Sequence, residues 1–362
     1  MKAAIFRRPG EKLTIEEVSI SNPGPREVLI RTAAVGLCHS DLHYIDGLYG
    51  VKTPTVLGHE AAGVIEKVGA DVTGLKPGDH VITCLSVFCG HCSYCTRGKP
   101  FSCDHKHETR RGEEEEPRLS LGGTPVHHFY DLAGFAEQML VHEHAVVKIR
   151  KDMPLDRAAL IGCAVTTGMG AVTNTAQIPV GSTVAVIGCG GVGLSAINGA
   201  AIAGAGRIIA IDIQPGKLDL ARAFGATDVI NAAGCDPVEA VRELTGGGVE
   251  YSFEALGMKK TAEQSYQMLC ASGTATVIGM VPEGQKLEID PVSLLMDLKL
   301  QGSNMGSNRF RVDMPRYVDF YMSGRLHLDK MVADRISLEQ INEGFDALRK
   351  GELARSVVTF DH

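Results

Sequence analysis

Four cysteines in one short stretch are the densest set of potential metal ligands in the chain: Cys89, Cys92, Cys95 and Cys103. Their spacing lets four thiolates converge on one point, as a closed tetrahedral zinc site requires. Disulfides, an iron–sulfur cluster and buried free thiols are alternatives, because spacing does not uniquely select a metal. We predict a structural zinc, since closed four-cysteine sites are its common form.

Three further soft ligands lie in separate segments, at Cys38, His59 and Cys163. They suggest a second metal that keeps an open coordination position for chemistry. Taken singly, each cysteine would more often be a small buried hydrophobe than a ligand. His59-Glu60 resembles the start of a zinc-protease motif, but Gly63 stands where the second histidine would be needed.

A glycine-rich turn indicates a dinucleotide site. Gly188, Gly190 and Gly193 match G-x-G-x-x-G, and Cys189, Gly191 and Val192 fill the remaining positions. The turn follows an apolar run and opens a predicted helix at 194–203, whose free N–H groups can bind a pyrophosphate. The alternative is a tight strand–helix turn that binds no ligand.

An acidic residue lies at the expected distance beyond this turn. Asp212 ends the second apolar run, where a carboxylate can accept hydrogen bonds from ribose hydroxyls and repel a 2′-phosphate. No arginine follows it in Ile213-Gln214, so we predict NAD rather than NADP. Lys217 could reach the same ribose, although a solvated helix lysine is the ordinary interpretation.

The elements that must position these residues fall into two patterns. Residues 1 to about 160 are β-rich, with strands expected near 28–31, 62–65 and 81–83. From about 183, apolar strands alternate with helical stretches, which indicates βαβ units and a parallel sheet. An amphipathic run at 338–348 and a strand at 356–360 end the chain and could rejoin the first part. The charged stretch 104–125, with Glu113–Glu116, is expected to be an exposed loop or a short surface element.

Composition excludes several classes of function. A chain of 362 residues is expected to form two domains. The net charge of −7 argues against a nucleic-acid partner. No apolar run could span a membrane, and the start lacks an apolar signal core, so we expect a cytoplasmic protein without a membrane partner. The ten cysteines then fit thiols and metal ligands.

Taken together, the motifs resemble those of the zinc-containing medium-chain alcohol dehydrogenases. The resemblance rests on Gly58-His59-Glu60-x-x-Gly63 with Gly69 and Val72, on the four-cysteine stretch and on the glycine-rich turn. It runs from Met1 to Phe360 and is closest to the two-zinc branch that includes animal and plant alcohol dehydrogenases and glutathione-dependent formaldehyde dehydrogenase.

The resemblance implies a ligand set for the second metal. Cys38, His59 and Cys163 would hold a catalytic zinc, with the fourth position left for water or substrate. Asp41 would orient the His59 ring, and Glu60 would lie behind the metal.

It also implies catalytic and cofactor contacts. Ser40 and His43 would form a proton relay. The positions that match cofactor contacts are His39, Thr167, Val192 and Arg355, the last in the motif Gly351-Glu-Leu-Ala-Arg355.

The implied fold is α/β. A GroES-like, β-rich catalytic domain would comprise 1–164 and 305–362, with a structural zinc lobe at about 89–103. A Rossmann domain with a doubly wound parallel sheet would fill 165–304, and the active site would lie in the cleft between the domains. The resemblance implies two zinc ions per chain, NAD as cofactor and a homodimer.

The implied reaction is reversible hydride transfer between an alcohol and NAD, giving an aldehyde and NADH. Residues near the pocket positions of the family are apolar or aromatic, namely Leu48, Tyr49, Leu85 and Phe135. They favour a small-molecule substrate that is a medium-chain or aromatic primary alcohol.

Two other functions stay open. A glutathione- or thiol-dependent formaldehyde dehydrogenase would need a cationic residue facing the pocket, and Arg110, Arg111 and Arg118 are the candidates. A zinc-stabilised, NAD(H)-binding sensor would be non-catalytic and would need no open zinc site.

Overall fold

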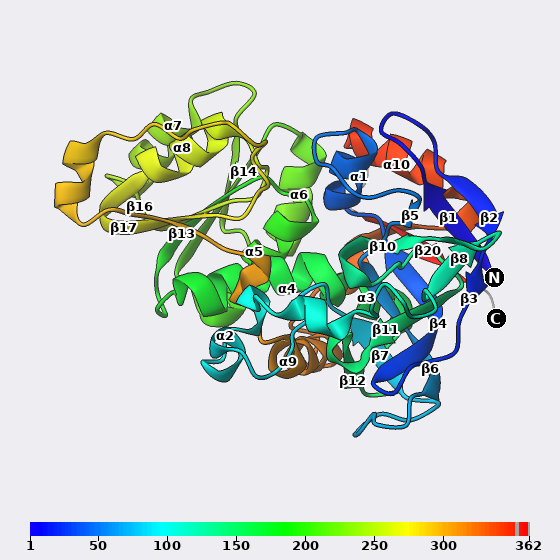
Figure 1. Cartoon of the computed structure of the whole chain (residues 1–362). Helices are drawn as coiled ribbons and strands as arrows, with labels where there is room; N and C mark the ends of the chain where they lie inside the picture. The colour runs from blue at the N-terminus through cyan, green and yellow to red at the C-terminus, as the bar shows by residue number, and fades with distance from the viewer. Residues whose placement is uncertain (352–354, 361–362) are drawn as a thin grey trace. The chain divides into compact units, whose positions relative to one another are not determined.

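The computed structural model describes residues 1–351 and 355–360, and it divides into two compact units (Figure 1). The first comprises Met1–Cys163 together with the described residues from Arg309 onward. The second is Ala164–Asn308. Residues Glu352 to Ala354 of the predicted C-terminal motif lie outside the described part of the chain.

The first unit is built on mostly antiparallel sheets, in which only β19–β20 and β5–β10 pair in parallel among the described strands. Its largest sheet has the order β12-β7-β6-β4-β20-β19, and β11 also pairs with β4. These strands are β4 (Glu27–Gly36), β6 (Glu60–Val68), β7 (His80–Thr83), β11 (Gln138–His142), β12 (Val146–Ile149), β19 (Val332–Ile336) and β20 (Arg355–Thr359). Strand β20 pairs with the end of β4, so the C-terminal strand lies in the same sheet as the N-terminal segments.

Smaller sheets and helices complete this unit. The strands are β1 (Lys2–Phe6), β2 (Thr14–Glu17), β3 (Ser19–Ile20), β5 (Thr55–Val56), β8 (Leu119–Leu121), β9 (Thr124–Pro125) and β10 (His127–His128). The helices are α1 (His39–Ile45), α2 (Ser93–Thr96), α3 (Leu155–Leu160), α9 (Phe310–Met322) and α10 (Ile341–Lys350). Helix α10 buries Ile341, Phe345 and Leu348 on one stripe, as its amphipathic pattern predicts.

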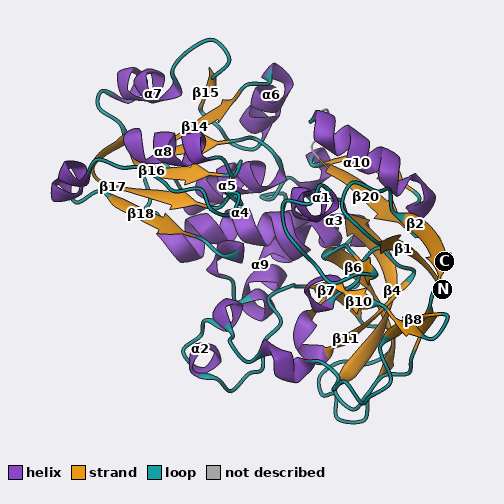
Figure 2. Cartoon of the chain, turned by 45° about the horizontal axis from the view of Figure 1, so that its top comes forward, coloured by secondary structure: helices purple, strands orange, loops and turns teal. Residues whose placement is uncertain are grey.

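The second unit contains a six-stranded parallel sheet with helices on both faces (Figure 2). Its order is β15-β14-β13-β16-β17-β18, which is the doubly wound order of dinucleotide-binding domains. The strands are β13 (Thr183–Ile187), β14 (Arg207–Asp212), β15 (Asp228–Asn231), β16 (Val249–Glu254), β17 (Leu269–Val277) and β18 (Lys299–Gly302). The helices are α4 (Thr166–Gly170), α5 (Gly191–Ala203), α6 (Pro215–Ala223), α7 (Pro237–Thr245) and α8 (Lys259–Gln267).

The predicted α/β fold, with a β-rich part and a doubly wound parallel sheet, is therefore confirmed. Each unit has its own apolar core. One core joins residues of β1, β4 and α10, and the other joins β13, β14 and α8. Within the described residues, no helix is long and apolar enough to cross a membrane.

Candidate metal centres and dinucleotide turn

The four cysteines of the lobe converge on one point. The Sγ–Sγ distances are 3.9 Å for Cys89–Cys95, 3.4 Å for Cys92–Cys95 and 3.8 Å for Cys92–Cys103. All four sulfurs lie within 4.8 Å of one another. A tetrahedral zinc with Zn–S bonds of about 2.3 Å requires S–S separations of roughly 3.8 Å. The cysteines are free, at separations far longer than a disulfide bond of about 2.05 Å.

Backbone amides donate hydrogen bonds to two of these sulfurs, those of Cys89 and Cys103. The N–H groups of His91 and Cys92 donate to Cys89 Sγ over 3.5 and 3.3 Å, and the Cys89 N–H donates to Cys103 Sγ over 3.3 Å. Burial alone would raise the pKa of Cys89, but the two amides lower it to about 7. A thiolate is the form that binds zinc, so the lobe fits that ion.

The second group, Cys38, His59 and Cys163, also converges, with all its ligand atoms within 4.8 Å of one another. Cys38 lies between β4 and α1, and His59 immediately precedes β6. Cys163 lies in a π-helical turn, Ile161–Val165, after α3. Three segments that are remote in sequence thus bring two sulfurs and an imidazole together in a buried place.

Asp41 sets the orientation of the His59 ring. Its Oδ1 accepts hydrogen bonds from His59 Nδ1 at 3.2 Å and from the Gly58 N–H at 3.0 Å. The other ring nitrogen, Nε2, is buried and has no hydrogen-bond partner among the described residues. An unpaired buried nitrogen is costly. A metal at the point shared with Cys38 and Cys163 would satisfy it, which is the fit expected of a metal-binding imidazole.

Arg355 and Glu60 lie beside these ligands. Arg355 Nη1 donates to the Leu37 carbonyl at 2.7 Å, Nη2 lies 3.9 Å from Cys38 Sγ, and Nε lies 3.9 Å from Glu60 Oε2. The Cys163 thiol, followed by Arg355 and His59, lowers the pKa of Cys38 well below its usual value. Arg355 is only 3% exposed, so it is not a solvated surface charge.

Aromatic side chains that the sequence did not single out surround His59. Phe129 and Tyr130 contact its ring edge-on, with ring centres at 5.7 and 6.1 Å. The Tyr130 hydroxyl lies 2.9 Å from that of Tyr44. Only the run Phe129-Tyr130 was visible in the sequence, and nothing in its spacing linked it to His59.

Helix α1 carries the predicted relay residues. His39, Ser40 and His43 lie on its seven residues directly after Cys38. His43 is partly buried, and burial lowers its pKa. Its ring centre lies 6.1 Å from that of Tyr49.

The predicted pocket residues are spread over different environments. Leu48 is 51% exposed, and Leu85 is partly buried against the core. Phe135 has no exposed surface and packs edge-on against Phe345 in the core, with ring centres at 5.8 Å. Phe135 therefore contributes to packing and presents no surface to an open pocket in this structure.

The glycine-rich turn in the second unit has the geometry that its sequence predicts. Gly188 has φ +92°, and a Cβ on Gly193 would lie 1.7 Å from the Gly188 carbonyl oxygen. Both positions therefore require glycine. A Cβ on Gly190 would meet nothing within 4 Å, which leaves room for a ligand to approach the backbone. Gly191 and Val192 begin α5.

Asp212 lies at the end of β14, next to this turn. Its Oδ2 accepts from the Cys189 N–H at 2.8 Å and its Oδ1 from the Gln214 N–H at 3.0 Å. Lys217 lies in the first turn of α6, which follows β14, and is partly exposed. Thr167 lies in α4 and donates to Met305 Sδ at 3.3 Å.

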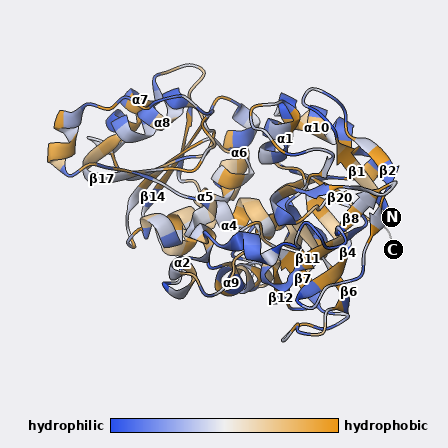
Figure 3. Ribbon diagram, viewed as in Figure 1, coloured by the Kyte–Doolittle hydropathy of each residue, from blue (hydrophilic) through white to orange (hydrophobic). Residues whose placement is uncertain are grey.

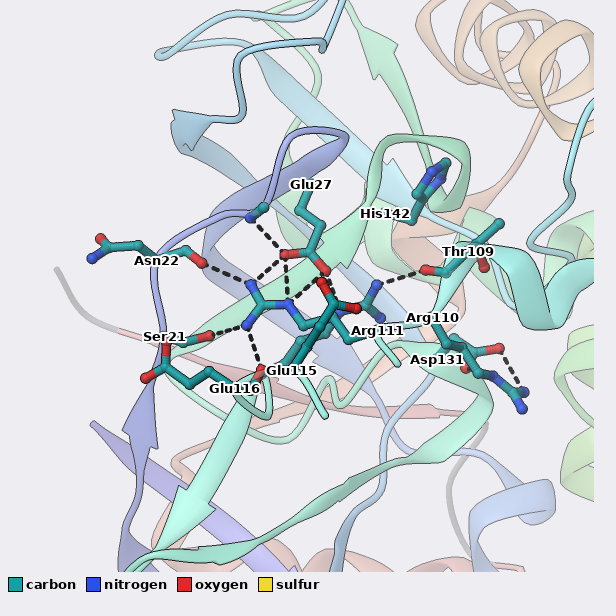
Figure 4. Close-up of polar contacts among 12 residues, drawn as sticks. Ser21, Asn22, Glu27, Thr109, Arg110, Arg111, Glu115, Glu116, Asp131 and His142 are labelled. Atoms are coloured by element: carbon teal, nitrogen blue, oxygen red, sulfur yellow. Dashed lines mark hydrogen bonds and ion pairs between the residues drawn. The ribbon is translucent and has the colours of Figure 1, made fainter. Parts of the chain in front are cut away.

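The charged stretch 104–126 is anchored by its arginines (Figure 4). Arg111 and Arg118 both bind the buried carboxylate of Glu27, with N–O distances of 3.1 and 2.7 Å. Arg110 binds Asp131 at 2.6 Å. Glu113–Glu116 are exposed, as expected. All three arginines have carboxylate partners within the first unit.

Comparisons with known proteins agree with this architecture. Residues 24–151 match the alcohol dehydrogenase GroES-like domain family, and residues 191–322 match the zinc-binding dehydrogenase family. An alcohol dehydrogenase zinc-binding domain protein from Burkholderia ambifaria has a similar structure, with 37% identity and a TM-score of 0.95 over 100% of this chain and 99% of its own.

Two further solved structures are informative. Benzyl alcohol dehydrogenase from Acinetobacter calcoaceticus has 33% identity and a TM-score of 0.94 over 99% of both chains. A zinc-binding dehydrogenase from Sinorhizobium meliloti, bound to NADP, has 28% identity and a TM-score of 0.83 over 99% of both chains. These likenesses confirm the resemblance predicted from the motifs: the chain belongs to the zinc-containing medium-chain alcohol dehydrogenase family.

Proposed function

We propose that this protein is an NAD-dependent alcohol dehydrogenase that carries a catalytic and a structural zinc ion. The observation that carries the proposal is the convergence of Cys38, His59 and Cys163, with the His59 ring held by Asp41 and its Nε2 left for a metal. Two thiolates and one imidazole leave a zinc ion one open position, as catalytic sites of this kind do.

A zinc ion in this position would act as a Lewis acid toward an alcohol oxygen, while NAD would accept the hydride. The side chains of the protein would then transfer the proton of the alcohol and stabilise the metal ligands. Ser40, one residue after His39 on α1, would accept the hydroxyl proton and pass it toward His43. The cationic Arg355 would offset the negative charge of the Cys38 thiolate.

Asp212 supports NAD over NADP. Its carboxylate is held beside the glycine-rich turn by two backbone N–H groups, where it would accept a bond from a ribose hydroxyl and repel a 2′-phosphate. Gly188, Gly190, Gly191, Val192 and Gly193 would face the pyrophosphate. Because a relative at 28% identity binds NADP, the assay below compares both cofactors.

The aromatic surroundings of His59 favour an apolar primary alcohol, aromatic or of medium chain length. Tyr130, whose ring centre lies 6.1 Å from that of His59, supplies partly exposed ring surface, and Tyr44 and Tyr49 continue it. The similarity to a benzyl alcohol dehydrogenase points the same way. The formaldehyde-adduct alternative loses its support, because the candidate arginines are committed to Glu27 and Asp131.

A homodimer is also part of this proposal, formed through the second unit. Strand β18 pairs only with β17 in the described structure, so its other edge is open. Close by in sequence, the 3₁₀ helix η7 (Pro291–Met296) exposes the side chains of Val292, Leu295 and Met296. The ribbon of this segment is partly in the hydrophobic orange of Figure 3. Such a patch beside an unpaired edge is typical of an interface.

A substrate panel tests the function. Benzyl alcohol, octanol and a glutathione–formaldehyde adduct are each assayed with NAD and with NADP, and zinc is counted by mass spectrometry. The proposal expects two zinc ions per chain and the highest kcat/KM for an apolar alcohol with NAD. One zinc ion and no oxidation of any alcohol would instead support a non-catalytic sensor.

A further inference from the structure

Histidines and carboxylates collect on the solvent side of the four-cysteine lobe, outside the thiolate group itself. His91 lies between Cys89 and Cys92, and the others follow Cys103 directly. This set, which we call the lobe rim, consists of His91, Asp104, His105, His107 and Glu108. All five are exposed.

Two of these residues meet across a long stretch of chain. His91 Nε2 lies 2.6 Å from Glu108 Oε2, although the residues are 17 positions apart. One ligand atom of each also lies within 4.8 Å of Cys89 Sγ. His91 lies between two of the four cysteines, and Glu108 lies in the short 3₁₀ helix η2 (Lys106–Thr109).

A second, similar group lies beside the first. His105 Nδ1 is 2.7 Å from Asp104 Oδ1, and both residues are within reach of Cys92 Sγ. The His105 ring centre lies 6.2 Å from that of His91 and 5.9 Å from that of His107. Exposed ion pairs of this kind contribute little to stability, so stability does not explain why imidazoles and carboxylates gather at the thiolates.

We propose that His91 and Glu108, together with the Cys89 thiolate, bind a further divalent transition-metal ion at the lobe rim. Imidazole, carboxylate and thiolate are all ligands that Zn²⁺ accepts. His91 and Glu108 are 65% and 40% exposed, so an ion can reach them from solution. His105 is the nearest residue that could complete the coordination.

The position of Cys89 gives this site a second consequence. Cys89 belongs both to the rim group and to the four-cysteine group. An ion bound at the rim could therefore pass to the inner site by keeping Cys89 and exchanging His91 and Glu108 for the other cysteines. The rim is an entry point for the structural zinc, whose own sulfurs are more buried than the rim side chains.

Zinc binding to the zinc-loaded, tag-free full chain tests the proposal. The protein is dialysed against increasing Zn²⁺, and the zinc bound per chain is measured by mass spectrometry. We expect one saturable equivalent beyond the resident ions. His91→Ala and Glu108→Gln should each weaken it at least about tenfold, as loss of a ligand does, and leave the resident zinc unchanged. His127→Ala, an exposed histidine outside the lobe, is the matched control.

Two results would overturn the proposal. One is a wild-type protein without an additional equivalent. The other is an equivalent that His91→Ala and Glu108→Gln retain at wild-type affinity. A second measurement addresses the entry role: after removal of the lobe zinc, both variants should recover it at least about tenfold more slowly than the His127→Ala control. Recovery at the control rate would refute that role.

Discussion

His59 has two ring nitrogens in different environments, and this difference defines the role of Asp41. Nδ1 bonds to Asp41, and Nε2 points to the place shared with Cys38 and Cys163. A carboxylate in this position fixes the tautomer and raises the basicity of a metal-binding imidazole.

Asp41→Asn should therefore weaken zinc binding at the Cys38 site about 10- to 100-fold. The amide oxygen can still accept one hydrogen bond but carries no charge. Chelator competition measures the loss, with zinc counted per chain. Asp71→Asn, at an exposed carboxylate, is the control. Equal zinc affinity in both variants would mean that Asp41 does not support the metal site.

Ser40→Ala tests the proton relay. Ser40 lies on α1, two residues beyond Cys38, and its loss should reduce kcat by about 10² or more while both zinc ions stay bound. The variant should also change the pH dependence of kcat, which a purely structural role would not do. Ser40→Thr keeps the hydroxyl and should recover activity. Wild-type turnover in Ser40→Ala at every pH would contradict the relay.

At the level of elements, the end of β14 and the glycine-rich turn are joined by a hydrogen bond. Asp212 accepts a hydrogen bond from the Cys189 N–H, so the acid that we propose to select the ribose also holds the turn. Asp212→Asn keeps one acceptor oxygen and removes the charge. We expect the ratio of kcat/KM for NAD to that for NADP to fall at least about tenfold. Asp219→Asn, an exposed position on α6, is the control. An unchanged ratio would show that Asp212 does not select the cofactor.

The anchor of the 104–126 stretch is a second element with a measurable effect. Burial alone would raise the pKa of Glu27, but Arg111 and Arg118 lower it to about 2. A carboxyl with a lowered pKa adds stability above its unfolded value of about 4.3, and this stability is lost as pH falls toward 2. The contribution at pH 7 is on the order of 3 kcal/mol.

Glu27→Gln should therefore lower the free energy of unfolding at pH 7 by about 3 kcal/mol, since it also leaves the buried Arg118 and the partly buried Arg111 without a carboxylate partner. The difference from wild type should shrink between pH 5 and pH 3. Urea unfolding at each pH measures it, with Glu114→Gln, at an exposed position of the same stretch, as control. A difference that does not vary with pH would contradict the ion-pair account.

These elements show what the sequence could and could not predict. Periodicity predicted the strands of the parallel sheet and the helix after the glycine turn, because local apolar spacing determines them. The partner of Arg118 was not predictable, since Glu27 is 91 residues away and only the folded chain joins them. The contact between Tyr130 and His59 was not predictable either, since these residues are also remote in sequence. Phe135 was expected near the pocket because of its place in the family pattern. The sequence did not reveal that tertiary packing buries its side chain completely.

For the whole molecule, the exposed apolar residues of η7 and the open edge of β18 indicate assembly through the second unit. The apolar side chains exposed on η7 include Leu295 at 83%, Val292 at 66% and Met296 at 59%. Monomeric soluble proteins rarely leave such residues clustered in water, and the free edge of β18 offers unpaired N–H and C=O groups to a second copy. The proposed dimer would cover both features at once.

Leu295→Lys should shift the dimer toward monomer, because pairing would bury a charge on each side of a two-fold interface. We expect the dimer dissociation constant to rise at least about a hundredfold, which corresponds to about 3 kcal/mol. Sedimentation at several protein concentrations measures it. Val180→Lys, at an apolar residue that is 85% exposed outside this patch, should leave the assembly unchanged. If Leu295→Lys dimerises as tightly as that control, η7 is not part of the interface, and the open edge of β18 must be capped in another way.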